Sequence, residues 1–136
     1  MTDAADTDLE ERAETEWRDL APHIIRQRLI IEATTDEIVG PDLMKNYLFE
    51  LANVTKMQVL SGPYVYSAHE LGWGGWIHWR TSGANAYSYP ERNEGTNKLP
   101  PLFTVDTYTC KPFSVKDAVK FTRDYIKPIE LVYKEL

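Results

Sequence analysis

The sequence predicts a two-layer α+β fold, in which an antiparallel sheet carries helices on one face. Two segments, one after Gly40 and one after Ser114, have the apolar periodicity of amphipathic helices. Short runs rich in β-branched and aromatic residues lie between them, separated by glycine-rich or polar turns. This order is typical of helices that cover one face of an antiparallel sheet. The other face would then need a partner, so we expect a homo-oligomer, a dimer or higher.

The N-terminal segment is expected to form an acidic amphipathic helix over residues 7–21. Thr7 and Glu10 fit a capping box, in which each side chain satisfies a free backbone N–H. The apolar stripe of this helix consists of Leu9, Ala13, Trp17 and Leu20. We therefore divide the chain into a helical extension, residues 1–22, and a domain, residues 23–136. The stripe is expected to dock on the body or on a neighbouring subunit, and a dedicated partner-binding helix is the alternative.

Within the domain, residues 25–32 are predicted to form an Ile-rich first strand. A helix opens at Gly40-Pro41, because proline is favoured at the first helical position. Its expected core face consists of Leu43, Tyr47, Leu48, Leu51 and Val54. Further strands are predicted at 57–60, 64–67, 75–80, 84–89 and 102–109, and a polar loop at 90–101. Ser114 and Asp117 cap the last helix, whose expected core face is Val115, Ala118, Val119, Thr122, Tyr125 and Ile126.

Composition and charge narrow the function classes. The chain has 136 residues and a net charge of −6. The first 20 residues hold eight of the 21 acidic residues and two of the 15 basic residues. The rest of the chain therefore has 13 acidic and 13 basic residues. An acidic extension repels phosphate and the body has no basic surplus, so nucleic-acid binding is disfavoured.

Membrane, secretory and metal classes are also disfavoured. No apolar run approaches the roughly 20 residues that cross a bilayer, and the N-terminus lacks a basic and apolar leader. The single cysteine, Cys110, excludes an internal disulfide and suits a reducing compartment, so we expect a cytoplasmic protein. The three histidines show no metal-ligand spacing, and we expect no metal.

Two motifs carry a family resemblance. They are T-S-G-A-N-A-Y-S-Y-P-E at residues 81–91 and F-T-V-D-T-Y-T-C at residues 103–110. Together they resemble the prokaryotic S-adenosylmethionine decarboxylases, whose pattern is E-S-H, a strand ending in aromatic-Pro-Glu, and a V-D-x-[FY]-T-C strand. R-L-I-I-E at residues 28–32 is similar to the first strand of that family. The resemblance spans residues 28–126, about three quarters of the chain.

The resemblance implies a decarboxylase of S-adenosylmethionine that supplies polyamine (spermidine) synthesis. Such enzymes make a pyruvoyl group from their own serine, which the resemblance places at Ser82, with cleavage after Thr81. It places at Cys110 the acid that reprotonates the product carbon. The implied substrate-binding residues are Tyr89, Glu32 and Glu91, at matching positions, with Tyr87 and Trp79 from an aromatic belt. Core and interface packing is the alternative interpretation of that belt.

Three family positions are changed in this chain. The residue before the cleaved bond is Thr81 rather than glutamate, a processing serine falls on Gly74, and a processing histidine falls on Tyr87. Other groups could take over their roles; the candidates are His78, Arg80, Asn85 and Ser88. Alternatively, the chain stays uncut. It is then a lyase that splits the sulfonium of S-adenosylmethionine, or a non-catalytic binding or regulatory paralogue.

Overall fold

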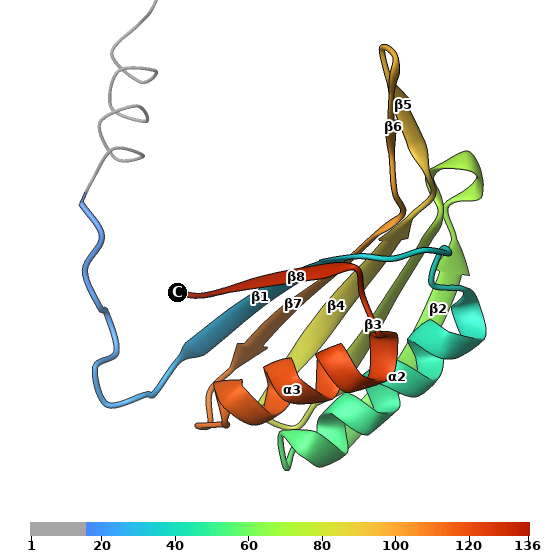
Figure 1. The fold of residues 1–136 in the computed structure, drawn as a ribbon. Coiled ribbons are helices and arrows are strands. Elements are labelled where there is room, and N and C mark those ends of the chain that lie inside the picture. The colour runs from blue at the N-terminus through green and yellow to red at the C-terminus, as the bar shows by residue number, and fades with distance from the viewer. Residues whose placement is uncertain (1–15) are drawn as a thin grey trace, which may run out of the picture.

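The computed structural model describes residues 16–136 and confirms the α+β class (Figure 1). The strands are β1 (Gln27–Thr34), β2 (Val59–Ser67), β3 (Trp73–Trp79), β4 (Ser82–Tyr89), β5 (Arg92–Glu94), β6 (Asn97–Leu99), β7 (Leu102–Thr109) and β8 (Glu130–Glu135). The helices are α2 (Pro41–Val54) and α3 (Val115–Ile126), with a short 3-10 helix, η1 (His69–Leu71). Six strands form one antiparallel sheet in the order β2-β3-β4-β7-β1-β8, and β5 and β6 form a separate hairpin.

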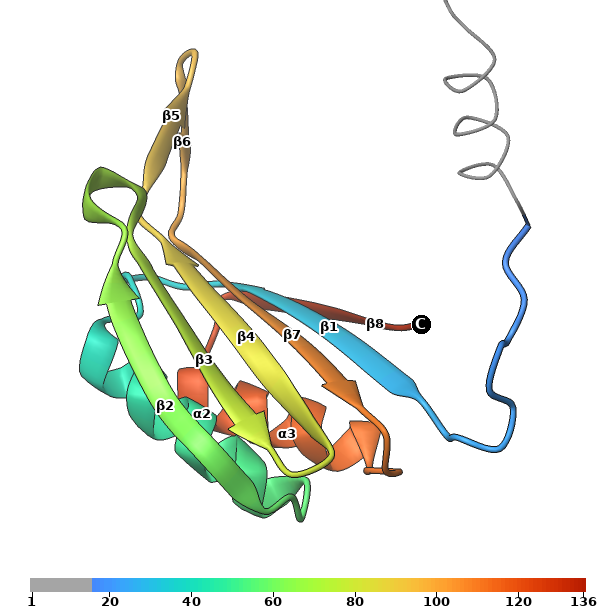
Figure 2. The ribbon, with the colours of Figure 1, turned by 180° about the vertical axis from the view of Figure 1, so that it is seen from behind.

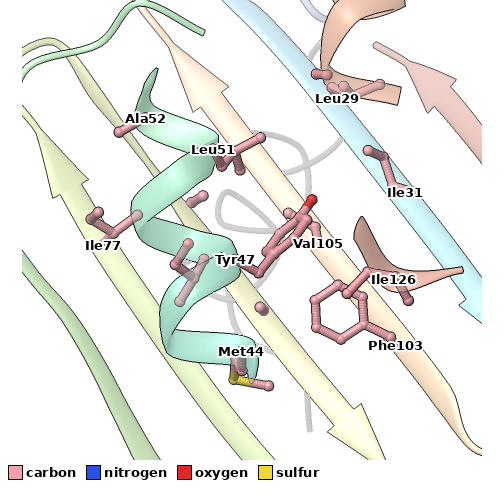
Figure 3. Packing of buried hydrophobic residues seen from close by; sticks show 14 of the residues in the cluster. Leu29, Ile31, Met44, Tyr47, Leu51, Ala52, Ile77, Phe103, Val105 and Ile126 are labelled. Atoms are coloured by element: carbon pink, nitrogen blue, oxygen red, sulfur yellow. The ribbon is translucent and has the colours of Figure 1, made fainter. Parts of the chain in front are cut away.

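Both helices lie on the same face of the sheet, as Figures 1 and 2 show from opposite sides. The core forms between these helices and alternate strand residues, and its largest buried side chains include Tyr47, Phe103, Ile31 and Ile77. Figure 3 shows the Tyr47 ring pointing from α2 towards β7. Among residues 16–136, no helix covers the opposite face of the sheet (Figure 2), and we call it the open face.

The predictions for the two helices of the domain are largely confirmed. Helix α2 begins at Pro41 as expected, and the Ser114 side chain accepts a hydrogen bond from the Asp117 N–H at the start of α3. The buried face of α2 is rotated relative to the prediction, because Met44 and Ala52 are buried there while Leu43 is 40% exposed.

The strand predictions needed several corrections, and β3 and β4 each begin two residues earlier than predicted. The first strand spans 27–34 rather than 25–32, because its pairing with β7 begins at Gln27 and the preceding isoleucines have no partner strand. The predicted strands 57–60 and 64–67 are one strand, β2, which bends at Gly62, where a positive φ of 96° suits glycine. Residues 90–101, predicted as a loop, contain the β5–β6 hairpin, and the tail contains β8.

The prediction of a helix over residues 7–21 is wrong for its described part. Residues 16–21 are not helical, and residues 7–15 lie outside the described residues. Trp17 is 87% exposed in an extended segment, where Arg26 forms an ion pair with Asp19. Within residues 16–136, no helix is long and apolar enough to span a membrane.

Candidate active site

The turn between β3 and β4 brings the two principal candidate residues to the same end of the sheet. Ser82 opens β4 and lies opposite Thr109, the last residue of β7, and Cys110 follows directly. The backbone N–H of Cys110 donates a hydrogen bond of 3.0 Å to the carbonyl oxygen of Thr81. Residues 28 positions apart in the sequence therefore meet at one point. The carbonyl that precedes Ser82 is already hydrogen-bonded to the backbone of Cys110.

The Ser82 hydroxyl lies on the helix-covered side of β4. Its Oγ is 3.1 Å from Thr81 Oγ1 and donates to Met57 Sδ at 3.5 Å. Because side chains alternate along a strand, Ser82 shares this side with Ala84 and Ala86, which are buried. Cys110 is a free thiol and is exposed.

A pocket of about 540 Å³ lies on the open face beside the Thr81–Ser82 bond. Its lining residues come from four strands and a turn, and they are Arg28, His78, Thr81, Ser82, Gly83, Ala84, Asn85, Asp106 and Tyr108. The strand register assembles them, since Gly83 lies opposite His78 on one side and Tyr108 on the other, and Asn85 lies opposite Asp106. We call this the Ser82 pocket.

An ion pair forms the charged part of the Ser82 pocket. Arg28 donates from Nε and Nη2 to the two carboxylate oxygens of Asp106, at 3.0 and 2.7 Å. These hydrogen bonds, together with the negative charge of Asp106, raise the pKa of Arg28. Both side chains are partly exposed, so the pair adds little stability. The two charges offset each other, which leaves the pocket polar but close to neutral at this point.

A second pocket of about 310 Å³ lies at the other end of β4, and it contains three of the predicted binding residues, Glu32, Tyr87 and Tyr89. The two tyrosines lie five and seven residues beyond Ser82, which is roughly 17 and 23 Å at about 3.3 Å per residue. One protomer therefore does not bring these side chains to Ser82. We call this the Tyr87 pocket.

Two other predicted binding residues lie outside both pockets. Glu91 is exposed at the base of the β5–β6 hairpin, where its carboxylate is 3.2 Å from the Lys98 ammonium. Trp79 is 2% exposed and belongs to the core on the helix-covered side. The substrate-binding role predicted for Trp79 is therefore corrected to core packing, the alternative interpretation of the aromatic belt.

The comparisons with known proteins support the fold. No family model and no curated protein matches the chain. Among solved structures, it is similar to the crystal structure of the adenosylmethionine decarboxylase from Aquifex aeolicus, with a TM-score of 0.63 and 14% identity. The match covers 83% of this chain and 89% of that chain. This chain has the adenosylmethionine decarboxylase fold.

The two positions at which the resemblance implies a processing serine and a processing histidine face each other in the sheet. Gly74 and Tyr87 are partners in the β3–β4 ladder. A Cβ atom built on Gly74 would lie 2.4 Å from Cζ and Oη of Tyr66, so the Tyr66 ring occupies the space above this glycine. A serine side chain would have no room there unless Tyr66 moved.

The structure also adds residues that the sequence did not single out. Arg28 and Tyr108 line the Ser82 pocket, although neither is a predicted site residue. Polar side chains at every second position of neighbouring strands could have pointed to Arg28 and Tyr108. This pattern identifies a shared pocket only when the register of the strands is known. No group of three His, Cys, Asp or Glu residues able to hold a metal ion occurs in the described part of the chain.

Proposed function

We propose that this protein acts on S-adenosylmethionine at the Ser82 pocket, as a decarboxylase whose pyruvoyl group is made from Ser82. The observation that carries the proposal is the hydrogen bond from the Cys110 N–H to the Thr81 carbonyl. This hydrogen bond holds Cys110 next to the Thr81–Ser82 peptide bond, which is the bond to be cut. The surrounding fold is similar to that of a known adenosylmethionine decarboxylase. The product would serve as an aminopropyl donor for polyamine, including spermidine, synthesis.

The chain's own residues fit the first step of self-cleavage. The Ser82 hydroxyl attacks the carbonyl carbon of Thr81, and its proton passes to the Ser82 nitrogen as the C–N bond breaks. An ester and a free Ser82 amine replace the amide. Negative charge develops on the Thr81 oxygen during the attack, and the Cys110 N–H already donates to that atom. A donor held in place before the reaction is an effective way to stabilise such a charge.

The remaining residues would act on the substrate. Once formed at Ser82, the pyruvoyl group supplies the electron sink that loss of CO2 requires. Cys110 is the free thiol at the same end of the sheet and is the proposed proton donor to the product carbon. Tyr108 offers an aromatic face at the pocket, a favourable neighbour for the positive sulfonium.

A second candidate function is favoured by the Tyr66 ring above Gly74. The side chains that assist self-cleavage in the family are absent at Gly74 and Tyr87, and the space of one is filled. An uncut chain could still split S-adenosylmethionine, because the sulfonium carries a good leaving group and correct binding supplies most of what the reaction needs. This candidate is a lyase that releases no CO2.

The intact mass of the purified full-length protein distinguishes the two candidates. We expect two chains, residues 1–81 and residues 82–136, the second beginning with the pyruvoyl group in place of serine. Incubation with S-adenosylmethionine labelled in its carboxyl group should then release labelled CO2. A single chain of 15.7 kDa that consumes the substrate without CO2 would establish the lyase instead. A single chain that binds the substrate without turnover would contradict both candidates.

We also propose that the working unit is a homo-oligomer in which the open faces of two copies meet. Large apolar side chains are exposed on this face, among them Tyr64, Tyr66, Tyr87 and Tyr108. The Ser82 pocket and the Tyr87 pocket lie at opposite ends of β4 in one protomer. A second copy with reversed strand direction would place its Tyr87 pocket over the Ser82 pocket of the first.

Sedimentation equilibrium tests this arrangement. We expect a mass of at least twice the 15.7 kDa of one chain. Tyr64→Asp should give monomers, because it puts a charge on the open face, where Tyr64 packs against Trp76 with ring centroids 4.8 Å apart. Phe49→Asp is the matched control, since Phe49 is similarly exposed but lies on α2, on the other side of the sheet. A wild-type monomer, or equal dissociation by both variants, would contradict the proposal.

A further inference from the structure

The self-cleavage proposed above needs a base that removes the Cα proton of Ser82, and the family position for that base holds Tyr87. A phenol is a poor base near neutral pH, whereas an imidazole suits general base catalysis there. We infer that His78, on the neighbouring strand, is this base. The inference rests on the proposed decarboxylase function and assigns a role that the resemblance does not supply.

His78 is held beside Ser82 by contacts on two sides. It lies opposite Gly83 in the β3–β4 ladder, one residue from Ser82. A Cβ atom built on Gly83 would lie 3.3 Å from His78 Cδ2, so the imidazole rests against the backbone that the glycine leaves open. On its other side the Trp76 ring lies at a centroid distance of 4.5 Å, tilted by 34°. The imidazole is thus positioned by packing while it remains exposed in the Ser82 pocket.

The two sides of β4 separate the base from the leaving oxygen. The Ser82 hydroxyl points to the helix-covered side, where it contacts Met57, and His78 lies on the open face. Elimination is favoured when the C–H and C–O bonds break on opposite sides of the carbon–carbon bond. This arrangement of base, Cα and Oγ is therefore suited to the step that follows ester formation.

Formation of the pyruvoyl group from the ester consumes one water molecule and no other reactant. His78 takes the Cα proton of Ser82, and the C–H electrons form the Cα=Cβ double bond. The Cβ–Oγ bond breaks, and Thr81 leaves as a carboxylate with the bonding electrons. The enamine that remains takes up a proton to become an imine, and water hydrolyses the imine to the pyruvoyl carbonyl with release of ammonia.

Other groups near Ser82 are less suited to this step. Arg80 lies in the exposed turn, and a guanidinium offers only hydrogen-bond donors. Asn85 is an amide without a basic nitrogen. Ser88 is buried and donates its hydroxyl to the Val39 carbonyl, and Asp106 is held by both donors of Arg28. His78 is the only imidazole among the residues that line the Ser82 pocket.

The test follows the full-length chain by intact mass after synthesis, comparing wild type with His78→Gln. A general base contributes at least about 100-fold, so the glutamine variant should cleave at least about 100-fold more slowly. The variant should also accumulate the ester, because ester formation precedes the blocked step. Hydroxylamine splits such an ester and releases a chain that begins with Ser82, a readout that a merely structural role would not produce.

Two controls separate failure of the inference from failure of the function. His69→Gln, at an exposed histidine in η1, should cleave at the wild-type rate, and imidazole in the buffer should restore cleavage to His78→Ala. If wild type cleaves and His78→Gln cleaves equally fast, the inference is overturned and the decarboxylase proposal stands. A slow variant without ester and without imidazole rescue also overturns it. If wild type never cleaves, the proposed function fails and this inference fails with it.

Discussion

Ser82→Ala is expected to leave the chain in one piece and to abolish CO2 release from S-adenosylmethionine. Without the hydroxyl nothing attacks the Thr81 carbonyl, so neither the ester nor the pyruvoyl group forms. The fold should tolerate the change, because the hydrogen bonds of the Ser82 hydroxyl are weak or local, to Thr81 Oγ1 at 3.1 Å and to Met57 Sδ at 3.5 Å. Intact mass and release of labelled CO2 measure the two effects on the same sample.

Two matched variants complete this experiment. Thr81→Val removes the neighbouring hydroxyl at nearly constant volume and should still be cut, since the Thr81 carbonyl and its hydrogen bond from Cys110 remain. Cys110→Ala should also be cut, because the backbone N–H is retained, but CO2-forming turnover should fall by about 100-fold with loss of the proton donor. Undiminished substrate consumption by Ser82→Ala would transfer the assignment to the uncut lyase.

The two helices of the domain were predictable because their signals are local and their apolar faces have a sheet to pack on. A proline at the start of α2 and the Ser114 and Asp117 pair at the start of α3 act within one helical turn, and both appear in the structure as expected. The strand at residues 102–109 was predicted with its observed bounds, because these residues form a continuous run of good strand formers, and every second one is buried.

The elements that were missed depend on pairing partners. The strand β8 is mostly exposed and forms because β1 offers an edge, with Leu29 opposite Glu135 and Thr34 opposite Glu130. Likewise, β5 and β6 are short, polar and mostly exposed, so composition alone indicated a loop. The partner of β8 is distant in the sequence, whereas β5 and β6 pair locally around Gly95 but lack the apolar alternation typical of strands.

The proximity of Ser82 and Cys110 was predictable from the sequence, but the pocket beside Ser82 was not. Motif spacing related Ser82 to Cys110, and the register of β4 and β7 brings them together. Tyr87 and Tyr89 lie on the same strand as Ser82, but their distance along β4 places them in a different pocket, which the motif does not show. Trp79 was assigned to the wrong side of the sheet. Its neighbour His78 lies in the Ser82 pocket on the open face, whereas Trp79 faces the core.

Tyr47→Ala is expected to give the largest loss of stability, about 3 to 5 kcal/mol, as for other buried aromatic side chains. The Tyr47 ring is fully buried, meets Phe103 edge-on at 5.2 Å and stacks on Phe121 at 5.3 Å between centroids. The first contact joins α2 to β7, as Figure 3 shows, and the second joins α2 to α3. Urea unfolding followed by tryptophan fluorescence measures the change. Tyr133→Ala, at a tyrosine that is 56% exposed, should cost less than about 1 kcal/mol.

The buried hydroxyl of Tyr47 is expected to make the free energy of unfolding depend on pH in the alkaline range. Burial raises the pKa of Tyr47 far above its ordinary value of 10.0, and the hydrogen bond with Thr122 only partly opposes the shift. Above pH 10 the unfolded chain therefore loses this proton while the folded chain keeps it. The unfolded state then binds fewer protons, so the free energy of unfolding falls as pH rises, by up to about 1.4 kcal/mol per pH unit.

Tyr47→Phe should remove this component and flatten the stability profile between about pH 10 and 11. At pH 8 it should cost only about 0.5 to 1.5 kcal/mol, the usual contribution of one hydrogen bond. Thr122 keeps a partner in the variant, because its hydroxyl also donates to the Ala118 carbonyl at 2.8 Å. Tyr133→Phe should retain the wild-type slope, since that phenol is exposed. Equal alkaline slopes for wild type and Tyr47→Phe would show that water reaches the Tyr47 hydroxyl in the folded protein.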